Sequence, residues 1–484
     1  MDKIYGRKLN KKNISLFYIT LLILVKIILV NLENLRVSYE SEIHMIIEGN
    51  GTQNILYNNF QYEPSEIIVN GYVNNSCKKT CFFHVDLNNI TIKFSNQINS
   101  SENMFRNLKN IIEIDLSNFD TSQITNMNYM FSGCSNLVTI YFGNIDTSSV
   151  ENMEHLFHGC FQINSIDLSK FDTSKVTSMF AMFLNCTNLE TINFGNINTS
   201  SVETMRSMFN KCSKLKSLNL SSFDTSKVTT FEYMFIYCYK LSFIDLSSFN
   251  TPNLLNITQM FYYCSNLKSI NFGNINTSLV ESMNHLFYHC SKLKSLDLSK
   301  FDTSKVTSMF SMFLNCTNLE TINFGNINTS SVETMRSMFN TCSKLESLNL
   351  SSFDTSKVTT FQYMFINCRN LKYLDISNFK ATNLSNMYRM ISNCKSLIYL
   401  NFYSFQLFLP INSTKAISET SENLIFCVKD NYTKNYLFGE DKISICLEPC
   451  SNDNYKKINE SIDGCVKSCY NYGFEYEYKN ICYH

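Results

Sequence analysis

Apolar and polar residues recur with a fixed period through most of this chain. A typical copy occupies residues 176–200 and begins with apolar side chains at the first position and three, six, seven and ten residues after it. They are Val176, Met179, Met182, Phe183 and Cys186. This spacing places them on one face of a helix, and the FDTS sequence just before them offers side-chain oxygens that cap a helix start. We therefore expect a short helix at residues 176–186 of this copy.

The second half of the copy has the pattern of a short strand. Ile192 and Phe194 are apolar and alternate with Thr191, Asn193 and Gly195, as in a strand with one buried face. A single helix–strand unit cannot bury its own apolar face, so the units must stack on one another. The sequence predicts an α/β solenoid of the leucine-rich-repeat kind, with a parallel sheet on one wall and short helices on the other.

Cysteine marks the period, because eleven cysteines follow one another every 26 residues without a slip. They are Cys134, Cys160, Cys186, Cys212, Cys238, Cys264, Cys290, Cys316, Cys342, Cys368 and Cys394. An earlier unit has Leu108 in the same place, which gives about twelve units and indicates an apolar pocket. A free cysteine behaves as a small buried hydrophobic residue, and consecutive helices stand too far apart for disulfides. We interpret these thiols as reduced, buried and structural, and expect no metal site.

The period divides the chain into four parts, and three of them precede residue 411. Residues 1–32 combine basic residues with an apolar run, which is typical of a signal peptide; an uncleaved membrane anchor is the alternative. Residues 33–100 lack the period and contain segments with strand patterns, as expected of a β-rich cap over the first unit. The repeat array occupies residues 101–410, and within it residues 171–238 recur almost unchanged at 301–368.

Cysteines outside the array have spacings unrelated to the period. Cys77 and Cys81 are four residues apart, and in an exported chain a disulfide is favoured over a metal half-site. The fourth part, residues 411–484, is polar and is expected to be a small module held by disulfides, with zinc as the alternative. Its cysteines are Cys427, Cys446, Cys450, Cys465, Cys469 and Cys482. Fifteen pairings of six cysteines are possible, and the spacing does not choose among them.

Composition and motifs exclude several functions. Basic and acidic side chains number 41 each, so no net charge attracts nucleic acid, and membrane contact is expected only through a possible N-terminal anchor. No nucleophile elbow, phosphate-binding loop or dinucleotide motif is present, and we expect neither enzymatic activity nor a cofactor. His285 and His289 lie one helical turn apart after Glu281. Because the HExxH order is missing, we prefer a solvated surface to a metal site.

The repeat unit resembles a known family. The pattern VTxMxxMFxxCxxLxxLxLSxFDTS is similar to the BspA-type leucine-rich repeats, in the 26-residue surface-protein form with MFxxC in place of AFxxC. Matching copies include MFSGCSNLVTIYF at Met130 and MFYYCSNLKSINF at Met260. The resemblance covers the array and implies a leucine-rich-repeat arc displayed outside the cell, in a family linked with adhesion to host or matrix proteins and to other cells.

Outward-facing strand positions are the candidate binding surface. One column holds Asp or Asn in nearly every unit, and aromatic residues interrupt the small polar residues around it in the C-terminal third. The candidate residues are Phe243, Asp245, Asp297, Asn323, Asn349, Tyr373, Asp375, Tyr399, Asn401 and Tyr403. Aromatic residues carry much of the binding energy of interfaces. Solvation of the sheet and hydrogen bonding along the column are the competing interpretation.

These features together predict a secreted or cell-surface adhesion or recognition protein that binds an extracellular protein or glycan through the repeat arc. A structural coat protein that associates with itself, without an external ligand, is the alternative. Many Asn-x-Ser/Thr sequons occur, among them Asn198, Asn276 and Asn328. On a eukaryotic secretory route some of them would carry glycans.

Overall fold

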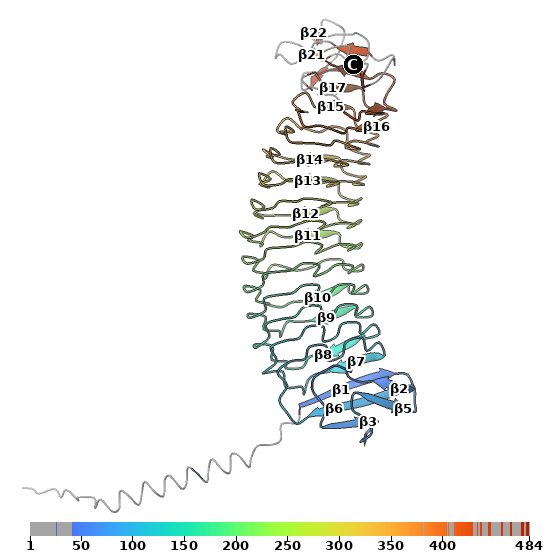
Figure 1. Ribbon diagram of the computed structural model, residues 1–484, viewed down its shortest axis with the longest axis vertical. Helices are drawn as coiled ribbons and strands as arrows, with labels where there is room; N and C mark the ends of the chain where they lie inside the picture. The colour runs from blue at the N-terminus through green and yellow to red at the C-terminus, as the bar shows by residue number, and fades with distance from the viewer. Residues whose placement is uncertain are drawn as a thin grey trace, which may run out of the picture.

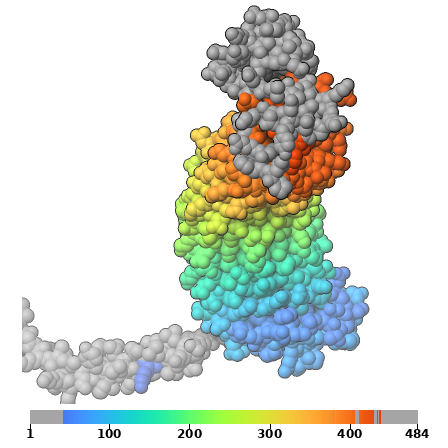
Figure 2. Space-filling model, turned by 45° about the horizontal axis from the view of Figure 1, so that its top comes forward, coloured from blue at the N-terminus to red at the C-terminus, as the bar shows by residue number. Residues whose placement is uncertain are grey.

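The main body of the protein is an elongated, gently curved column of stacked coils (Figure 1, Figure 2). The computed structural model describes residues 41–428 except 381, 404 and 406–410, together with residues 26, 433, 436 and 437 and the backbone of five short strands between residues 444 and 483. Apart from Lys26, the predicted signal or anchor therefore lies outside the described residues. Within the described part of the chain, no helix has both the length and the apolar character needed to cross a bilayer.

The N-terminal part contains two sheets, of which the larger continues into the first coil. The larger sheet has the strands β1 (Ser41–Glu48), β3 (Glu66–Val69), β4 (Tyr72–Val73) and β6 (Leu87–Phe94). In the smaller sheet β2 (Gly51–Asn54) pairs antiparallel with β5 (Thr80–Phe83). Strand β1 pairs antiparallel with β6 on one side and with β7 (Ile111–Asp115), the first strand of the array, on the other. It therefore covers the strand edge that the first coil would otherwise expose.

Short parallel strands stack along one wall of the column, which we call the strand wall. They are β8 (Thr139–Tyr141), β9 (Ser165–Asp167), β10 (Thr191–Asn193), β11 (Phe243–Asp245), β12 (Ser269–Asn271), β13 (Ser295–Asp297), β14 (Thr321–Asn323), β15 (Tyr373–Asp375), β17 (Tyr399–Asn401) and β19 (Ile425–Cys427). Strands of neighbouring coils pair in register in short sheets, as Ile166 of β9 does with Ile192 of β10, and β9–β10, β11–β12 and β13–β14 each form a two-stranded sheet. Because β17 pairs with β19, the coil register continues past residue 410.

The remaining strands lie at the C-terminal end of the column or on its second wall. Strand β20 (Ser444–Cys446) pairs with β19, and β16 (Ile391–Ser392) pairs with β18 (Ile417–Ser418) on the second wall. A separate four-stranded sheet has the order β22-β21-β24-β23. Its strands are β21 (Lys456–Lys457), β22 (Cys465–Val466), β23 (Tyr476–Tyr478) and β24 (Ile481–Tyr483).

The second wall, which we call the turn wall, consists of residues 179–186 and their equivalents in the other coils. The predicted helices are wrong, because the described residues of this wall contain no α-helix. Two kinds of backbone hydrogen bond alternate along this wall. The N–H groups of Met182, Leu184 and Cys186 donate to carbonyl oxygens three residues earlier in the same coil. The N–H groups of Ala181, Phe183 and Asn185 donate to carbonyl oxygens of the next coil.

Backbone conformation explains why no helix forms on the turn wall. Ala181 and Asn185 have φ angles of 53° and 65°, and the corresponding residues of other coils are also left-handed. An α-helix of L-residues does not accommodate such angles. Each segment is therefore a run of overlapping turns that is hydrogen-bonded to the next coil, and the fold is a β-solenoid rather than the predicted α/β leucine-rich-repeat arrangement.

The FDTS sequences form buried turns instead of helix caps. Asp172 accepts a hydrogen bond from the N–H of Ser174 through Oδ1 at 2.9 Å. Thr173 is fully buried, and its Oγ1 donates to the carbonyl oxygen of Asn198 in the next coil at 2.5 Å. The same threonine bond recurs in nine coils, from Thr147 to Thr355. A ladder of buried hydroxyl groups therefore joins the coils at this corner.

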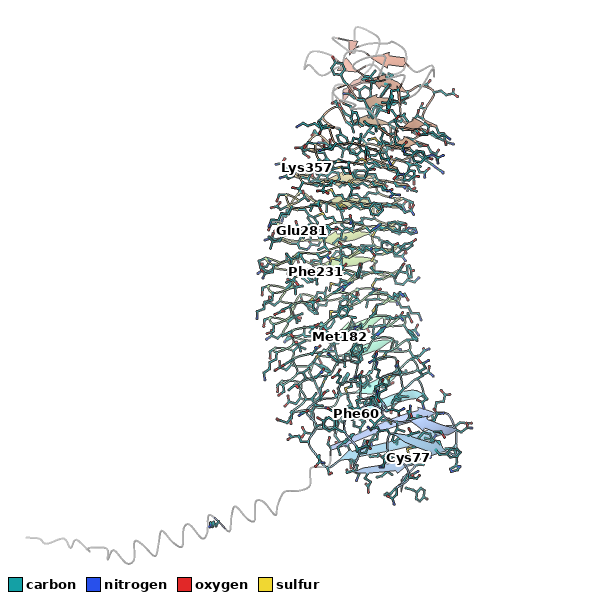
Figure 3. All side chains as sticks on the ribbon, in the orientation of Figure 1. Phe60, Cys77, Met182, Phe231, Glu281 and Lys357 are labelled. Carbon is teal, nitrogen blue, oxygen red and sulfur yellow. A yellow bond between two sulfur atoms is a disulfide. The ribbon has the colours of Figure 1, made fainter. Side chains whose placement is uncertain are left out.

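Columns of equivalent apolar side chains fill the interior. Eleven phenylalanines, one per coil from Phe105 to Phe365, form a continuous stack with ring centroids 5.4–5.9 Å apart. Met182 and Phe231, labelled in Figure 3, belong to the same buried core. Each coil thus supplies the apolar surface that covers its neighbour, which is why the array extends as one column.

Candidate binding surfaces

The strand wall presents two outward columns of side chains. One column holds Asp or Asn in almost every coil, and its ten members from Tyr141 to Asp375 are all exposed. The other column, two residues earlier, is mostly Ser or Thr. Between the two, an Ile or Leu of each coil packs against the core. The strand wall is therefore a mainly polar surface that extends through ten coils, with Tyr141 and Phe243 as exposed aromatic exceptions.

The Asp and Asn side chains also have a structural role. One side-chain oxygen accepts a hydrogen bond from the backbone N–H two residues later, as Asp245 does from Ser247 at 2.9 Å and Asn323 from Gly325 at 3.1 Å. Asx turns of this kind turn the chain at the end of a strand. Hydrogen bonds from Ser169 hold the pKa of the Asp167 carboxyl below its ordinary value. The column thus shapes each coil, and its side chains remain exposed to a partner.

The ten candidate binding residues fall into exposed and covered groups. The exposed ones are Phe243, Asp245, Asp297, Asn323, Asn349 and Asp375. Tyr373 and Tyr403 are half-buried, whereas Tyr399 and Asn401 are only 7% and 3% exposed. The accessible strand wall therefore ends near Asp375, and of the four aromatic candidates only Phe243, at 46% exposure, projects freely from it.

A shallow depression lies at the N-terminal part of the strand wall. It has a volume of about 580 Å³ and is lined by residues of β8, β9 and β10, including Asp167 and Asn193. Tyr141, at the end of β8, is 51% exposed. The contacts predicted from the sequence begin at Phe243 and do not include this region, although Tyr141 interrupts the Asp and Asn column as Phe243 interrupts the Ser and Thr column.

The eleven periodic cysteines are buried and unpaired. Each thiol donates a hydrogen bond to the carbonyl oxygen of a stacked phenylalanine 29 residues earlier, with Sγ–O distances of 3.0–3.2 Å. Burial raises the pKa of the thiols, that of Cys186 to about 12. A protonated, buried thiol is a poor nucleophile and metal ligand, so these groups are structural in this fold.

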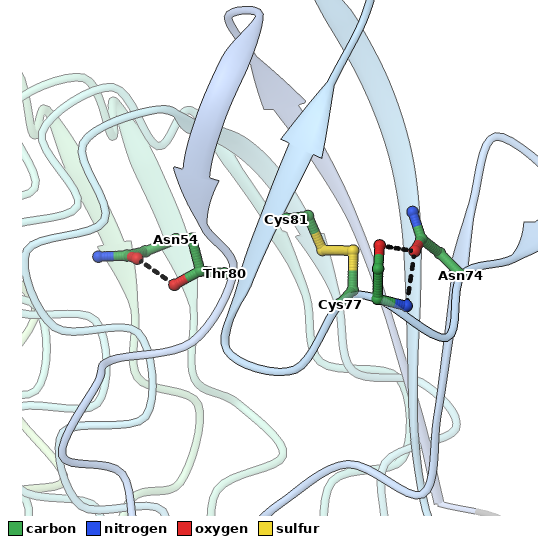
Figure 4. The surroundings of a disulfide bond; sticks show 6 residues. Asn54, Asn74, Cys77, Thr80 and Cys81 are labelled. Carbon is green, nitrogen blue, oxygen red and sulfur yellow. Dashed lines mark hydrogen bonds between the residues drawn. A yellow bond between two sulfur atoms is a disulfide. The ribbon is translucent and has the colours of Figure 1, made fainter.

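Cysteines outside the array form disulfides where their side chains are described. A disulfide joins Cys77 to Cys81 of β5, beside the hydrogen bond between Thr80 and Asn54 (Figure 4). Cys427 is also disulfide-bonded. The other predicted candidates of the C-terminal module lie outside the residues whose side chains are described. They are Cys446, Cys450, Cys465, Cys469 and Cys482.

His285 and His289 lie on the turn wall, where aromatic rings surround them. The Nδ1 atoms of both are buried without a hydrogen-bond partner, and burial lowers the pKa of both rings. Among the described residues, no group of three or more His, Cys, Asp or Glu side chains is arranged to hold a metal ion.

Beside these histidines lies an aromatic group that the sequence analysis missed. We call it the tyrosine cluster; it consists of Tyr237, Tyr239, Tyr262, Tyr263, Tyr288 and His289. Its signal in the sequence is the appearance of Tyr or His at the variable positions of MFxxC in three consecutive units. In most other coils the second of these positions is Asn or Gly, whereas the cluster has Tyr237, Tyr263 and His289 there.

Comparison with known protein families identifies the array. The family described as "Mycoplasma protein of unknown function, DUF285" matches residues 99–193, 185–296 and 281–399, which together make up more than half of the chain. The chain belongs to this family. The three matches in this DUF285 protein follow one another along the array, as expected of tandem repeats. No curated protein matches the chain.

Proposed function

We propose that this DUF285 protein is an exported, non-enzymatic adhesion or recognition protein of the BspA-like type, which binds protein or glycan partners through its strand wall. The observation that carries the proposal is the continuity of that wall, where ten coils present exposed side chains in register. The exposed Ser, Thr, Asp and Asn side chains repeat hydrogen-bonding groups at the coil spacing. Extended surfaces of this kind suit binding along the length of a solenoid.

Export is supported by the cysteines that lie outside the periodic column. Cys77 and Cys81 form a disulfide, and Cys427 is also disulfide-bonded. Disulfides persist mainly in oxidising compartments outside the cytosol. The apolar N-terminal segment of the sequence agrees with passage to such a compartment.

Two exposed aromatic residues are the expected anchors on the strand wall. Phe243 stands in the column that is Ser or Thr in neighbouring coils, and Tyr141 stands in the Asp and Asn column. They are 46% and 51% exposed. Because aromatic residues contribute strongly to interfaces, a partner that lies along the wall should lose affinity when they are removed.

The test is a binding screen of the full chain against extracellular matrix proteins and glycans, followed by substitution of the anchors. Phe243→Ser and Tyr141→Asn introduce residue types that neighbouring coils already carry, so the fold should be retained. We expect binding of a partner found in the screen to weaken tenfold or more.

Phe82→Ser is the matched control, because Phe82 is 58% exposed on β5, away from the strand wall. Binding that is unaffected by the anchor substitutions, or weakened equally by the control, would contradict the proposal. Polymers that grow with concentration in a sedimentation experiment, without any ligand signal, would support the self-associating coat protein instead.

A further inference from the structure

The tyrosine cluster occupies three consecutive coils of the turn wall and forms one contiguous aromatic surface. Tyr262 and Tyr288 stack with ring centroids 4.5 Å apart, and Tyr263 packs edge-on against His289 at 4.3 Å. Tyr237 contacts both Tyr239 and Tyr263. Tyr239 is 39% exposed and the other members are half-buried. The rings are therefore held in place by one another and remain accessible.

Three members of the cluster have a left-handed backbone conformation, which disfavours tyrosine. Tyr237, Tyr263 and His289 have φ angles of 58°, 58° and 61°. Bulky residues are rarely found in this left-handed region, whereas Gly and Asn are favoured there. The equivalent position is Asn or Gly in seven of thirteen coils, namely Asn107, Gly133, Gly159, Asn185, Asn315, Asn367 and Asn393. The turn conformation therefore does not account for tyrosine at these positions.

The internal duplication provides an independent comparison. Residues 171–238 and 301–368 differ at five positions only, and one of these pairs Tyr237 with Asn367. Asn367 has a φ angle of 62°, so both copies have the same backbone at this point. Residues 171–238, which border the cluster, therefore have tyrosine at this position. Residues 301–368, which lie farther along the array, have asparagine, the residue that a left-handed backbone favours.

Arginine covers other aromatic rings of the turn wall. In four of the five described arginines the guanidinium carbon lies 4.6–5.7 Å from the centroid of an aromatic ring. These distances are within the range of a cation–π interaction. The pairs are Arg106 with Tyr129, Arg206 with Phe180 and Tyr233, Arg336 with Phe310, and Arg389 with Tyr388. The turn wall is thus suited to hold guanidinium groups on its aromatic side chains.

The tyrosine cluster lacks this internal partner. No arginine lies over its rings among the described residues, and the sequence contains none between Arg206 and Arg336. Burial raises the pKa of the Tyr239 and Tyr288 phenols, and burial together with the neighbouring Tyr288 raises the pKa of Tyr262 to about 12, so these three phenols are neutral near pH 7. Burial also lowers the pKa of His289, so its ring is uncharged and does not repel a cation.

We propose that the tyrosine cluster is a second binding surface, which takes arginine side chains of a protein partner onto its tyrosine rings. The ring faces carry negative electrostatic potential, and a guanidinium group stacks on them with both charge and shape complementarity. This surface is separate from the strand wall and does not depend on the function proposed for it.

The test uses the full chain and a short peptide of alternating Gly and Arg, with binding followed by calorimetry. The control peptide replaces arginine with citrulline, which keeps the planar group and removes its charge. We expect binding of the arginine peptide and at least tenfold weaker binding of the citrulline peptide. Tyr237→Asn together with Tyr263→Asn should weaken arginine binding tenfold or more. The unfolding midpoint should stay the same or rise, because Asn suits a positive φ.

Phe243→Ser on the strand wall is the control variant, and its binding of the arginine peptide should equal that of the parent chain. The inference is overturned by equal binding of both peptides, or by unchanged binding in the double variant. It is also overturned if no arginine peptide binds and the double substitution instead abolishes binding of a glycan or of a second copy of this chain.

Discussion

The threonine ladder allows the strongest stability prediction. Thr303 is 1% exposed, and its Oγ1 donates to the carbonyl oxygen of Asn328 at 2.6 Å and accepts from the N–H of the same residue at 3.1 Å. Thr303→Val keeps the shape of the side chain and removes the hydroxyl group. Both backbone groups of Asn328 then lose a partner at a contact that is partly buried.

The expected loss of stability follows from those two groups. A buried hydrogen-bonding group without a partner costs about 1–3 kcal/mol, and the added methyl group offsets about 1 kcal/mol. For two groups these values leave a net loss of about 1–5 kcal/mol. Because the contact is partly buried, we expect Thr303→Val to lower the free energy of unfolding of its coils by about 1–3 kcal/mol, in the lower part of that range. Neighbouring coils should also exchange faster, because each coil is stabilised by the one beside it.

Amide hydrogen exchange is the suitable assay, because long repeat arrays do not always unfold in a single step. Thr307→Val is the matched control: Thr307 is exposed and donates to the carbonyl oxygen of Glu281 at 3.2 Å. Its effect should stay below about 1 kcal/mol. Thr173→Val, in the duplicated coil, should repeat the large effect. Equal exchange in Thr303→Val and Thr307→Val would refute the role assigned to the ladder.

Three further predictions concern other parts of the coil. Gly195→Ala should lower the free energy of unfolding, measured in urea, by about 2–4 kcal/mol. Its φ angle is +55°, and the new Cβ would lie 2.8 Å from Cα of Ser169. Gly51→Ala also has a positive φ angle but open space around it, so it should lower the free energy of unfolding by only about 1 kcal/mol. The eleven buried thiols should resist maleimide in the native protein and react after unfolding without reductant, and rapid labelling of the native chain would contradict their burial. The pKa of the Asp302 carboxyl lies below its ordinary value because Ser304 donates to the carboxylate. The ionised carboxylate therefore stabilises the folded protein above about pH 4, and this stabilisation is lost as the pH falls through the pKa that Asp302 has in the folded state. Asp302→Asn should therefore lose less stability than the parent chain between pH 5 and pH 2, and equal losses would show that this group does not contribute.

The sequence predicts the period, the stacking of units and the buried columns, because these depend on which side chains are apolar. Val176, Met179 and Cys186 are buried as expected. It also predicts an outward polar column on the strand wall. What it does not predict is the helix-free turn wall, since overlapping turns place the same apolar side chains inward as a helix would.

The left-handed residues that exclude a helix leave a weak signal. At the position of Ala181 the other coils carry residues such as Ser207, Tyr233 and His285, all with positive φ angles. Of these residue types only His is enriched at left-handed positions. The hydrogen bonds between coils impose the conformation, and such contacts between distant residues are not visible in a local pattern. The tyrosine cluster was missed for a related reason, because a helical interpretation treats its positions as a solvated surface.

The most direct test of the β-solenoid is a pair of Ala→Gly substitutions. Ala181 is fully buried with a φ angle of 53° at the centre of the predicted helix, and Ala416 is fully buried without a positive φ angle. At a left-handed position glycine removes the strain of the Cβ atom, so Ala181→Gly should raise the free energy of unfolding by about 0.5–1 kcal/mol. Ala416→Gly should lower it by about 1 kcal/mol. A loss of about 1 kcal/mol for Ala181→Gly as well, as expected in the interior of a helix, would contradict the account.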